Sequence, residues 1–333
     1  MKTKISVAIC TYNGESFLKE QIDSILNQTL KVDEIVVCDD GSTDGTLDIL
    51  EDYENRNPNV FRIFENKINL KSVKNFEQAI KKCSGDYIFL SDQDDIWATN
   101  KVEKYIDYFY ENKNINVLAS NGFCINDKSK VLNRYSLWDI PQYFREKKIE
   151  FCYFDIISRI SNIATGATIA IRRNFLIDIL PFPDIKDLHH DEWIALISSY
   201  RNSFEILNDK YFYYRIHEKQ QVGGVFYDEN TTNLDPEIEF FDYNNKNVNF
   251  YVFKHRLNKL AKFYNLNYAL KSIDEKKMMN YDNIINKIIA LNKKTKILMK
   301  KKYFFKSNVL FITDFILNKR QITSQTINNI KNK

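Results

Sequence analysis

Short apolar runs alternate with segments of helical hydrophobic spacing through the first third of the chain. The runs of strand length occupy 5–10, 34–38, 61–64 and 86–90, and helical spacing follows them in 16–26, 46–53, 73–82 and 101–110. Strands that alternate with helices predict a parallel sheet covered by helices on both faces. Chemistry in such α/β folds gathers at the carboxyl ends of the strands, so we expect the polar residues that follow the strands to form the site.

The second part of the chain changes character near residue 245. Further strands are predicted at 116–124, 167–172 and 211–216, with a helix at 191–200. Beyond residue 245, lysine, asparagine and isoleucine dominate, and apolar positions recur at helical spacing. The pattern therefore predicts an α/β domain over residues 1–244 and a basic, mainly helical C-terminal region over residues 245–333.

Charge is divided between these two regions. The chain has a net charge of +4, but residues 246–333 carry 20 Lys and Arg against 4 Asp and Glu. The remaining residues carry 28 Lys and Arg against 40 Asp and Glu, so the net charges are +16 for the tail and −12 for the body. An acidic body with a basic tail indicates that the two regions have different tasks.

Basic residues in the tail are interleaved with aromatic and aliphatic ones. Lysines between 293 and 302 run directly into Tyr303-Phe304-Phe305. This composition suits an anionic membrane surface. It suits equally well a helical appendage that packs on the body or on a second subunit of a homodimer. Nucleic-acid binding is not expected, because no nucleic-acid motif is present and the body is acidic.

Cysteine usage indicates a reducing compartment, and hydropathy indicates neither a signal peptide nor a membrane-spanning segment. The cysteines are odd in number and widely spaced, and no CxxC pair occurs, which argues against a disulfide framework or a structural zinc site. The apolar run at 5–10 is too short for a signal-peptide core, and no stretch approaches the roughly 20 apolar residues that span a bilayer. We therefore expect a cytoplasmic protein, peripheral at the inner face of the cell membrane if the tail binds lipid.

The strongest chemical signal is Ser91-Asp92-Gln93-Asp94-Asp95, here called the acidic loop (residues 91–95), directly after a predicted strand. Three carboxylates so close together repel one another and cost stability unless a positive charge lies among them. Oxygen ligands of this kind suit Mg²⁺ or Mn²⁺ bound together with substrate phosphates. A solvated acidic loop is the alternative, which the preceding strand and the following Trp97 disfavour.

Two further polar segments follow predicted strands. The Asp39 turn (residues 39–46) reads Asp-Asp-Gly-Ser-Thr-Asp-Gly-Thr, and turn formation with helix capping explains residues 42–46. Turn geometry alone does not require the adjacent Asp39 and Asp40, which could accept hydrogen bonds from a base or a ribose. The Tyr12 loop (residues 11–14) ends the first strand and offers an aromatic ring that could stack on a nucleobase.

These three segments, in this order, resemble the motifs of the family 2 inverting glycosyltransferases with a GT-A fold. The form of residues 92–97 is similar to that of a bacterial subgroup containing rhamnosyltransferase-like surface-polysaccharide enzymes. The resemblance covers roughly residues 4–225. It implies an α/β, Rossmann-like GT-A domain that acts on nucleotide-diphospho-sugars, here followed by the C-terminal helical appendage, and it implies Mn²⁺ or Mg²⁺ as the cofactor.

The resemblance also assigns residues to the donor side. The nucleotide contacts would be Thr11, Tyr12, Asn13, Asp39, Asp40, Asp92 and Arg215. The metal ligands would be Asp94 and His217, with Asp95 nearby. The segment 214–217 followed by 221–224 resembles the Y-R-x-H loop of the family, which would close over the diphosphate.

On the acceptor side, His190-Asp191-Glu192-Trp193 matches the H-D-x-W pattern of the subgroup. The general base would be Asp191, with Glu192 as the alternative and His190 as a secondary candidate. Gly166 begins a run of small residues that matches the acceptor-side turn of the family, although a plain loop entering a strand explains it almost as well.

The function implied by the resemblance is transfer of a sugar, with inversion, from a UDP- or dTDP-sugar to the hydroxyl of a glycan or lipid-linked glycan. The pathway would be synthesis of a bacterial surface polysaccharide. An inactive, transferase-like scaffold or binding module is the alternative from another class. A sugar-nucleotide pyrophosphorylase would need a Gly-rich basic loop after the first strand, and a dinucleotide oxidoreductase would need G-x-G-x-x-G there; neither is present.

Overall fold

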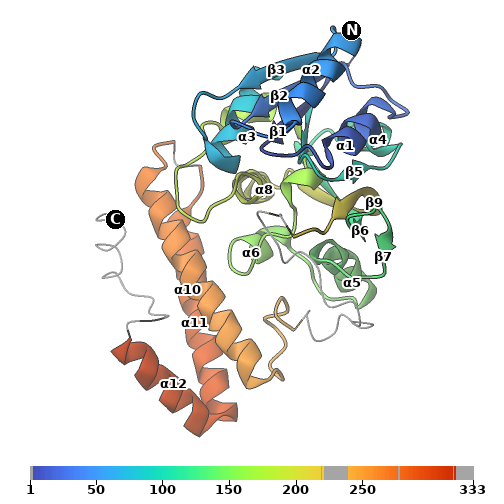
Figure 1. The fold of residues 1–333 in the computed structure, drawn as a ribbon. Helices are drawn as coiled ribbons and strands as arrows, with labels where there is room; N and C mark the ends of the chain where they lie inside the picture. The colour runs from blue at the N-terminus through green and yellow to red at the C-terminus, as the bar shows by residue number, and fades with distance from the viewer. Residues whose placement is uncertain (1–2, 219, 221–238, 277, 318, 320–333) are drawn as a thin grey trace. The chain divides into compact units, whose positions relative to one another are not determined.

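The computed structural model of the chain describes residues 3–218, 220, 239–276, 278–317 and 319 (Figure 1). The strands are β1 Ile5–Thr11, β2 Glu34–Asp39, β3 Phe61–Glu65, β4 Tyr87–Ser91, β5 Ile96–Trp97, β6 Val117–Ile125, β7 Val131–Leu132, β8 Ala170–Arg172 and β9 Phe204–Arg215. The helices are α1 Leu18–Leu26, α2 Thr46–Arg56, α3 Lys71–Lys82, α4 Lys101–Glu111, α5 Ile140–Glu146, α6 Tyr153–Ile157, α7 Leu176–Ile179, α8 His190–Tyr200, α10 Phe250–Ile273, α11 Tyr281–Lys302 and α12 Phe304–Ile316.

The chain divides into two compact units. The first comprises Met1–Phe151, Ile163–Phe182 and His189–Thr232, and the second comprises Cys152–Asn162, Pro183–Leu188 and Asn233–Lys333. The second unit thus includes two short segments from the middle of the chain that hydropathy does not single out. The boundary expected at residue 245 stays a prediction.

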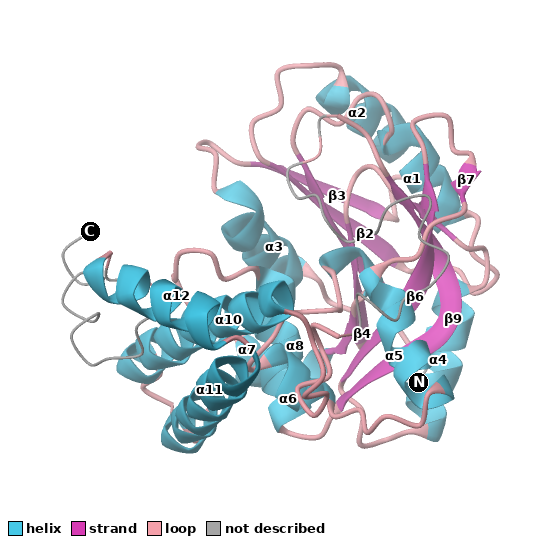
Figure 2. Cartoon of the chain, turned by 90° about the horizontal axis from the view of Figure 1, so that it is seen from below, coloured by secondary structure: helices cyan, strands magenta, loops and turns pink. Residues whose placement is uncertain are grey.

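A mixed sheet forms the centre of the first unit. Within the described residues its strand order is β3-β2-β1-β4-β8-β6-β9-β5, and β7 pairs with β6. The alternating first part is confirmed, because β1 pairs in parallel with both β2 and β4, and β2 with β3. Figure 2 shows α1 and α2 on one side of these strands and α3 on the other. Because helices cover both faces, every residue of β2 and β4 is buried. Strands buried in this way have nearly continuous apolar sequences.

The later strands depart from the parallel pattern. β8 pairs antiparallel with β4 and β6, while β6 and β9 are parallel neighbours. The strand expected at 167–172 is confirmed only over Ala170–Arg172, because Gly166–Thr168 forms a 3₁₀ turn. The strand expected at 211–216 begins earlier, at Phe204, because pairing with β6 extends it.

The helices predicted for the tail are confirmed. Asn249 and Asn280 cap α10 and α11 by accepting hydrogen bonds from the backbone N–H groups of Val252 and Asn283, at 3.0 Å each. A core joins α10, the end of α11 and α12; it consists of Val248, Val252, Phe253, Leu257, Met299 and Leu310. In the described ranges, no helix combines the length and the apolar character needed to cross a bilayer.

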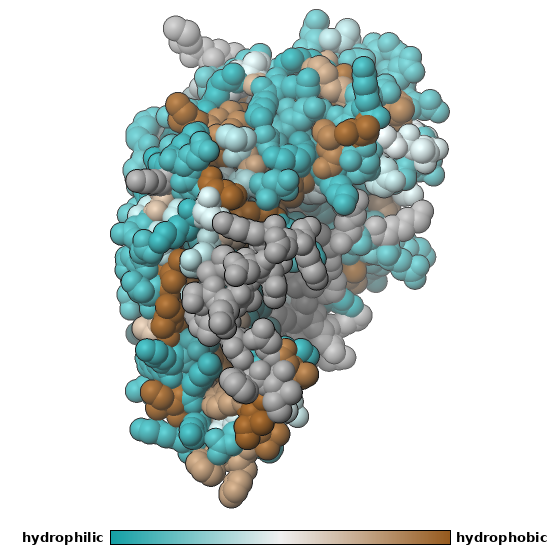
Figure 3. Space-filling view, turned by 90° about the vertical axis from the view of Figure 1, so that its left-hand side faces the viewer, coloured by the Kyte–Doolittle hydropathy of each residue, from teal (hydrophilic) through white to brown (hydrophobic). Residues whose placement is uncertain are grey.

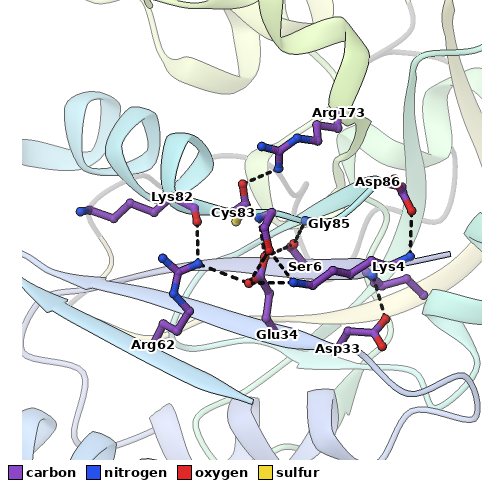
Figure 4. A network of polar contacts seen from close by, with 12 residues as sticks. Lys4, Ser6, Asp33, Glu34, Arg62, Lys82, Cys83, Gly85, Asp86 and Arg173 are labelled. Atoms are coloured by element: carbon purple, nitrogen blue, oxygen red, sulfur yellow. Dashed lines mark hydrogen bonds and ion pairs between the residues drawn. The ribbon is translucent and has the colours of Figure 1, made fainter. Parts of the chain in front are cut away.

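The amino ends of the parallel strands are tied together by the buried carboxylate of Glu34 (Figure 4). It accepts hydrogen bonds from the hydroxyl groups of Ser6 and Ser84 and from the backbone N–H of Ser84, and it pairs with Lys4 and Arg62 at 3.7 and 3.4 Å. Burial alone would raise the pKa of Glu34, but these hydrogen bonds lower it to about 2.

We expect Glu34→Gln to lower the free energy of unfolding by about 1–3 kcal/mol at pH 7, because the charged carboxylate is better satisfied in the fold than in water. The depressed pKa of Glu34 makes this stabilisation complete above about pH 4.5, and it is lost as the pH falls towards about 2. Urea unfolding at pH 7 and pH 3 should therefore show a smaller difference between wild type and variant at pH 3. Asp52→Asn, which removes an exposed ion pair with Arg56, is the matched control. An equal difference at both pH values would contradict this account.

Candidate active site

The carboxyl ends of β1, β2 and β4 lie side by side at one edge of the sheet. Thr11 is in register with Asp39, and Ile9 with Ser91. The Thr11 hydroxyl donates a 2.7 Å hydrogen bond to Asp39 Oδ2. The Tyr12 loop, the Asp39 turn and the acidic loop therefore meet in space, as their positions after strands predicted.

Asp39 organises its own turn. Its Oδ1 accepts hydrogen bonds from the N–H groups of Gly41 and Ser42 at 3.1 and 2.8 Å, and its Oδ2 accepts from the Ser42 hydroxyl at 2.6 Å. The side chain is fully buried. The expectation that turn geometry does not require Asp39 was therefore wrong for this residue, since its carboxylate closes the turn.

Asp40 is engaged in a similar way by the segment that follows β3. Its Oδ1 accepts hydrogen bonds from Leu70 N–H and Asn66 Nδ2 at 2.7 and 2.9 Å, and its Oδ2 accepts from Lys71 N–H at 2.8 Å. Lys71 has a φ of 61°, an uncommon conformation for a residue other than glycine. Asp40 therefore holds this segment in place, and the contact with the base expected for it remains a prediction.

The Tyr12 loop presents an aromatic side chain at the strand edge. Tyr12 as a whole residue is 40% exposed. Asn13 adopts a φ of 49° and joins the loop to the Asp39 turn: its N–H donates to the Ser42 hydroxyl, and its Oδ1 accepts from Thr43 N–H at 2.8 Å. The loop is thus held by its neighbour while the ring remains accessible.

The acidic loop concentrates uncompensated negative charge. Burial, followed by repulsion from Asp94 and Asp191, raises the pKa of Asp92 to about 7. Burial, followed by repulsion from Asp94 and Asp92, raises the pKa of Asp95 well above its usual value. Among the described residues, Asp95 Oδ2 is buried without a hydrogen-bond partner. An orphaned carboxylate oxygen among like charges is what a cation would relieve.

The two predicted metal ligands are adjacent. His217 Nε2 lies 2.9 Å from Asp94 Oδ2, although the residues are far apart in sequence. Neighbouring ligands of an octahedral ion with bonds of about 2.1 Å lie roughly 3.0 Å apart, so this spacing fits a shared Mg²⁺ or Mn²⁺ as well as it fits a hydrogen bond. No set of three or more His, Cys, Asp and Glu residues suited to a metal occurs in the described part of the chain. The pair therefore fits an ion that takes its remaining ligands from substrate phosphates and water.

Arg215 is placed differently from the expectation that it contacts the nucleotide. It is fully buried, and its guanidinium donates to the carbonyl oxygens of Asp94 and Asn126, at 2.8 and 3.2 Å, and to the carboxylate of Glu20. It also lies over the Phe17 ring, and its backbone N–H donates to Asp95 Oδ1 at 3.0 Å. We correct its role accordingly: Arg215 supports the acidic loop from behind. Residues 221–224, the second part of the expected diphosphate loop, lie outside the described residues.

The predicted base, Asp191, lies in the first turn of helix α8. Asp191 is partly exposed, and its Oδ1 accepts a 2.7 Å hydrogen bond from Glu192 N–H. Its charge raises the pKa of Asp92, so the structure places it near the acidic loop. The alternative base, Glu192, is buried.

His190 and Gly166 are in contact, although they come from separate elements. A Cβ at Gly166 would lie 2.7 Å from His190 Nε2, so a larger residue there would displace the imidazole. His190 stacks on Phe76 with 4.1 Å between ring centroids, and neither ring nitrogen has a partner among the described residues. Burial lowers the pKa of His190 to about 4, which keeps the ring neutral near pH 7.

Sequence reasoning missed two residues that contact this site. Gln93 hydrogen-bonds the backbone of Tyr12. Lys101 is fully buried at the start of α4, where its Nζ donates to Ala167 O at 2.7 Å and lies 4.1 Å from the centroid of the Trp97 ring. A lysine at a helix start is normally solvated, so no sequence signal marks this one.

Comparison with known proteins gives one family match and several relatives. Residues 6–180 match the family model described as Glycosyl transferase family 2. RfbG of Shigella flexneri, a dTDP-rhamnosyl transferase, is 32% identical over 227 residues, which are 65% of this chain and 74% of RfbG. EpsE of Bacillus subtilis (strain 168), described as a glycosyltransferase, is 31% identical over 163 residues, which are 49% of this chain and 58% of EpsE. The aligned part is thus less than two thirds of EpsE.

Solved structures share the fold. The structure of S. aureus TarS 1-349 in complex with UDP has a TM-score of 0.50 at 18% identity, covering 90% of this chain and 91% of that one. The mannosyltransferase PcManGT from Pyrobaculum calidifontis, in complex with GDP-Man and Mn²⁺, has a TM-score of 0.50 at 14% identity, covering 95% of this chain and 81% of that one. The GT-A fold predicted from the sequence is therefore confirmed.

The burial of Lys101 predicts how the free energy of unfolding depends on pH. Burial lowers its pKa to about 7, although Asp95 and Asp92 act to raise it, whereas a lysine in an unfolded chain titrates near pH 10.4. Since the unfolded chain binds more protons between these values, Lys101 makes stability rise with pH over that window. We expect urea unfolding in EDTA to show wild type gaining stability relative to Lys101→Met between pH 7 and pH 9.5. Lys104→Met, an exposed lysine on the same helix, should show no such trend. A difference independent of pH for Lys101→Met would contradict the prediction.

Proposed function

Because this chain belongs to glycosyl transferase family 2, we propose that it transfers a sugar from a UDP- or dTDP-sugar to an acceptor hydroxyl, with inversion, in bacterial surface-polysaccharide synthesis. The observation that carries the proposal is the meeting of the Tyr12 loop and the acidic loop at one edge of the sheet, with the charge of Asp191 acting on Asp92 of that loop. The relatives support both donor bases, since RfbG is named a dTDP-rhamnosyl transferase and TarS was solved with UDP and with UDP-GlcNAc.

On the donor side, the Tyr12 ring would stack on the base. The diphosphate would then extend towards Asp94 and His217, which would hold a divalent cation between them. When bound, Mn²⁺ or Mg²⁺ supplies positive charge that stabilises the departing diphosphate. Arg215 contributes indirectly, because its hydrogen bonds to Asp94 O and Asp95 Oδ1 keep the acidic loop in one conformation.

On the acceptor side, Asp191 would accept the proton of the attacking hydroxyl. Its Oδ1 is fixed by the Glu192 N–H at the start of α8, which orients the carboxylate. Attack from the face opposite the leaving diphosphate inverts the anomeric carbon in one displacement. Glu192 is less suited to this step because its side chain is buried. The acceptor would be a glycan or a lipid-linked glycan.

The test is nucleotide-sugar binding and turnover by wild type, Asp94→Ala and Asp191→Asn. We expect UDP- or dTDP-sugars with Mn²⁺ to raise the melting temperature of wild type and of Asp191→Asn, but not of Asp94→Ala. Release of UDP or dTDP in the presence of a bacterial lipid extract should fall by about 10²–10⁴-fold in Asp191→Asn, because the base is lost.

Asp107→Ala, an exposed carboxylate on α4, is the matched control and should behave as wild type. Binding without turnover in wild type would favour the alternative, a transferase-like scaffold or binding module of a polysaccharide assembly. Full activity of Asp191→Asn would remove Asp191 from the mechanism, and a matching loss in Glu192→Gln would assign the base to Glu192.

For the basic tail we propose contact with an anionic membrane surface, which would place the enzyme peripherally on the cytoplasmic side of the cell membrane. Helix α12 exposes Phe304, Phe305, Val309 and Ile312 by 56, 83, 63 and 59%. Apolar side chains are visible in the lower part of Figure 3, where α12 lies. Lys300, Lys301 and Lys302 end the preceding helix, so positive charge adjoins the apolar surface. Apolar insertion combined with basic flanks is how interfacial helices bind anionic lipid.

Flotation with phosphatidylglycerol-containing liposomes tests the membrane contact. We expect wild type to float, and Phe305→Ser to bind about tenfold more weakly, because a large exposed ring no longer enters the lipid. Ile177→Ser, which changes a 76% exposed apolar residue on α7, is the matched control and should float as wild type does. Failure of wild type to float, together with a dimer that Phe305→Ser dissociates, would show instead that a second copy covers this surface.

A further inference from the structure

Gln93 stands between Asp92 and Asp94, yet its side chain turns towards another loop. Its Oε1 accepts a 2.8 Å hydrogen bond from the backbone N–H of Tyr12, and its Nε2 donates a 3.1 Å hydrogen bond to the carbonyl oxygen of the same residue. One amide thus satisfies both backbone groups of Tyr12, as a neighbouring strand would. The two bonds also settle the orientation of the amide, since the N–H of Tyr12 can only meet the oxygen.

Gly14 shows how closely the Tyr12 loop packs on this amide. A Cβ at Gly14 would lie 2.4 Å from Gln93 Oε1 and 2.5 Å from Gln93 Cδ, closer than real contacts allow. The φ of Gly14 is not in the left-handed region, where the structure places Gly41. A Cβ at position 14 would therefore displace the Gln93 amide, which ends a flexible side chain and can move, whereas the backbone conformation at this position places no demand for glycine.

We propose that Gln93 is a positioning residue that joins the Tyr12 loop to the acidic loop and thereby sets the affinity for the nucleotide. This inference rests on the proposed function. A nucleotide diphosphate must reach the Tyr12 ring with its base and the Asp94–His217 pair with its phosphates. The side chain of Gln93 links these two places, so it fixes the distance between them that one bound nucleotide must match.

Binding of UDP and dTDP by calorimetry tests the role, in Mn²⁺ and separately in EDTA. We expect Gln93→Ala to bind about tenfold more weakly than wild type in both conditions, because Tyr12 loses two hydrogen bonds that hold its backbone. Gln93→Glu should not restore binding, since a carboxylate cannot donate to Tyr12 O. Gln142→Ala, an exposed glutamine on α5 bonded to Glu146, is the control for general effects, and melting temperatures check that each variant is folded.

A double-mutant cycle with Gly14 provides a readout that general destabilisation would not give. Gly14→Ala should weaken nucleotide binding in wild type but much less in the Gln93→Ala background, where the space taken by the amide is free. If the losses of nucleotide affinity in the two single variants were strictly additive in the double variant, the Tyr12 loop would not pack directly on the Gln93 amide. Weaker binding by Gln93→Ala in EDTA alone, with wild-type affinity in Mn²⁺, would show that alignment of the two loops does not set the affinity and would overturn the positioning role.

The outcomes separate this inference from the proposed function. Nucleotide binding by wild type with equal affinity in Gln93→Ala would overturn the role of Gln93 and leave the transferase proposal standing. Absence of nucleotide binding by folded wild type would overturn the proposed function and the role of Gln93 together.

Discussion

Asp92, Asp94 and Asp95 lie close together at the end of a buried strand, and Asp191 adds a further carboxylate from α8. Their mutual repulsion is the constraint to which the surrounding structure responds. Lys101 offsets their negative charge only in part, because burial lowers its own pKa to about 7, and the Arg215 backbone and guanidinium hold the loop through Asp95 Oδ1 and Asp94 O. This compensation is incomplete, because Asp95 Oδ2 stays unpartnered among the described residues. A site left short of positive charge in this way is suited to a ligand that brings a cation with it.

At the opposite edge of the sheet, the negative charge of a buried carboxylate is fully compensated by its neighbours. Glu34 is buried as well, but its carboxylate receives hydrogen bonds from Ser6 and Ser84 together with two cationic neighbours, so its pKa falls while those of Asp92 and Asp95 rise. A buried carboxylate therefore stabilises the amino ends of the strands, whereas the buried carboxylates at the carboxyl ends repel one another. Parallel strands make this division possible, since all their amino ends meet at one edge and all their carboxyl ends at the other.

Local pattern in the sequence was enough to predict the alternating strands, the helical tail and the meeting of three polar loops, because each depends on neighbours within a few residues or on parallel order. Roles that depend on distant partners were not accessible. The burial of Arg215 follows from Glu20 and the segment after β6, which lie far away in the chain. The burial of Lys101 depends on Ala167, and the engagement of Asp40 depends on the backbone of residues 70 and 71. Hydropathy and motif spacing carry no information about such pairings.

The order of the sheet has a consequence for how the protein folds. The strands that carry the Tyr12 loop, the Asp39 turn and the acidic loop all lie within the first 91 residues and pair with strands of that same segment. His217 and the guanidinium of Arg215 reach the same edge only after loops of more than 100 residues have closed, and long loops close late and slowly. We therefore expect β1 to β4 to assemble while the acidic loop still lacks its contacts with Arg215 and His217. The carboxylates of the loop would then stay hydrated until β9 docks. Desolvation of the acidic loop would then be a late event in folding, coupled to completion of the site.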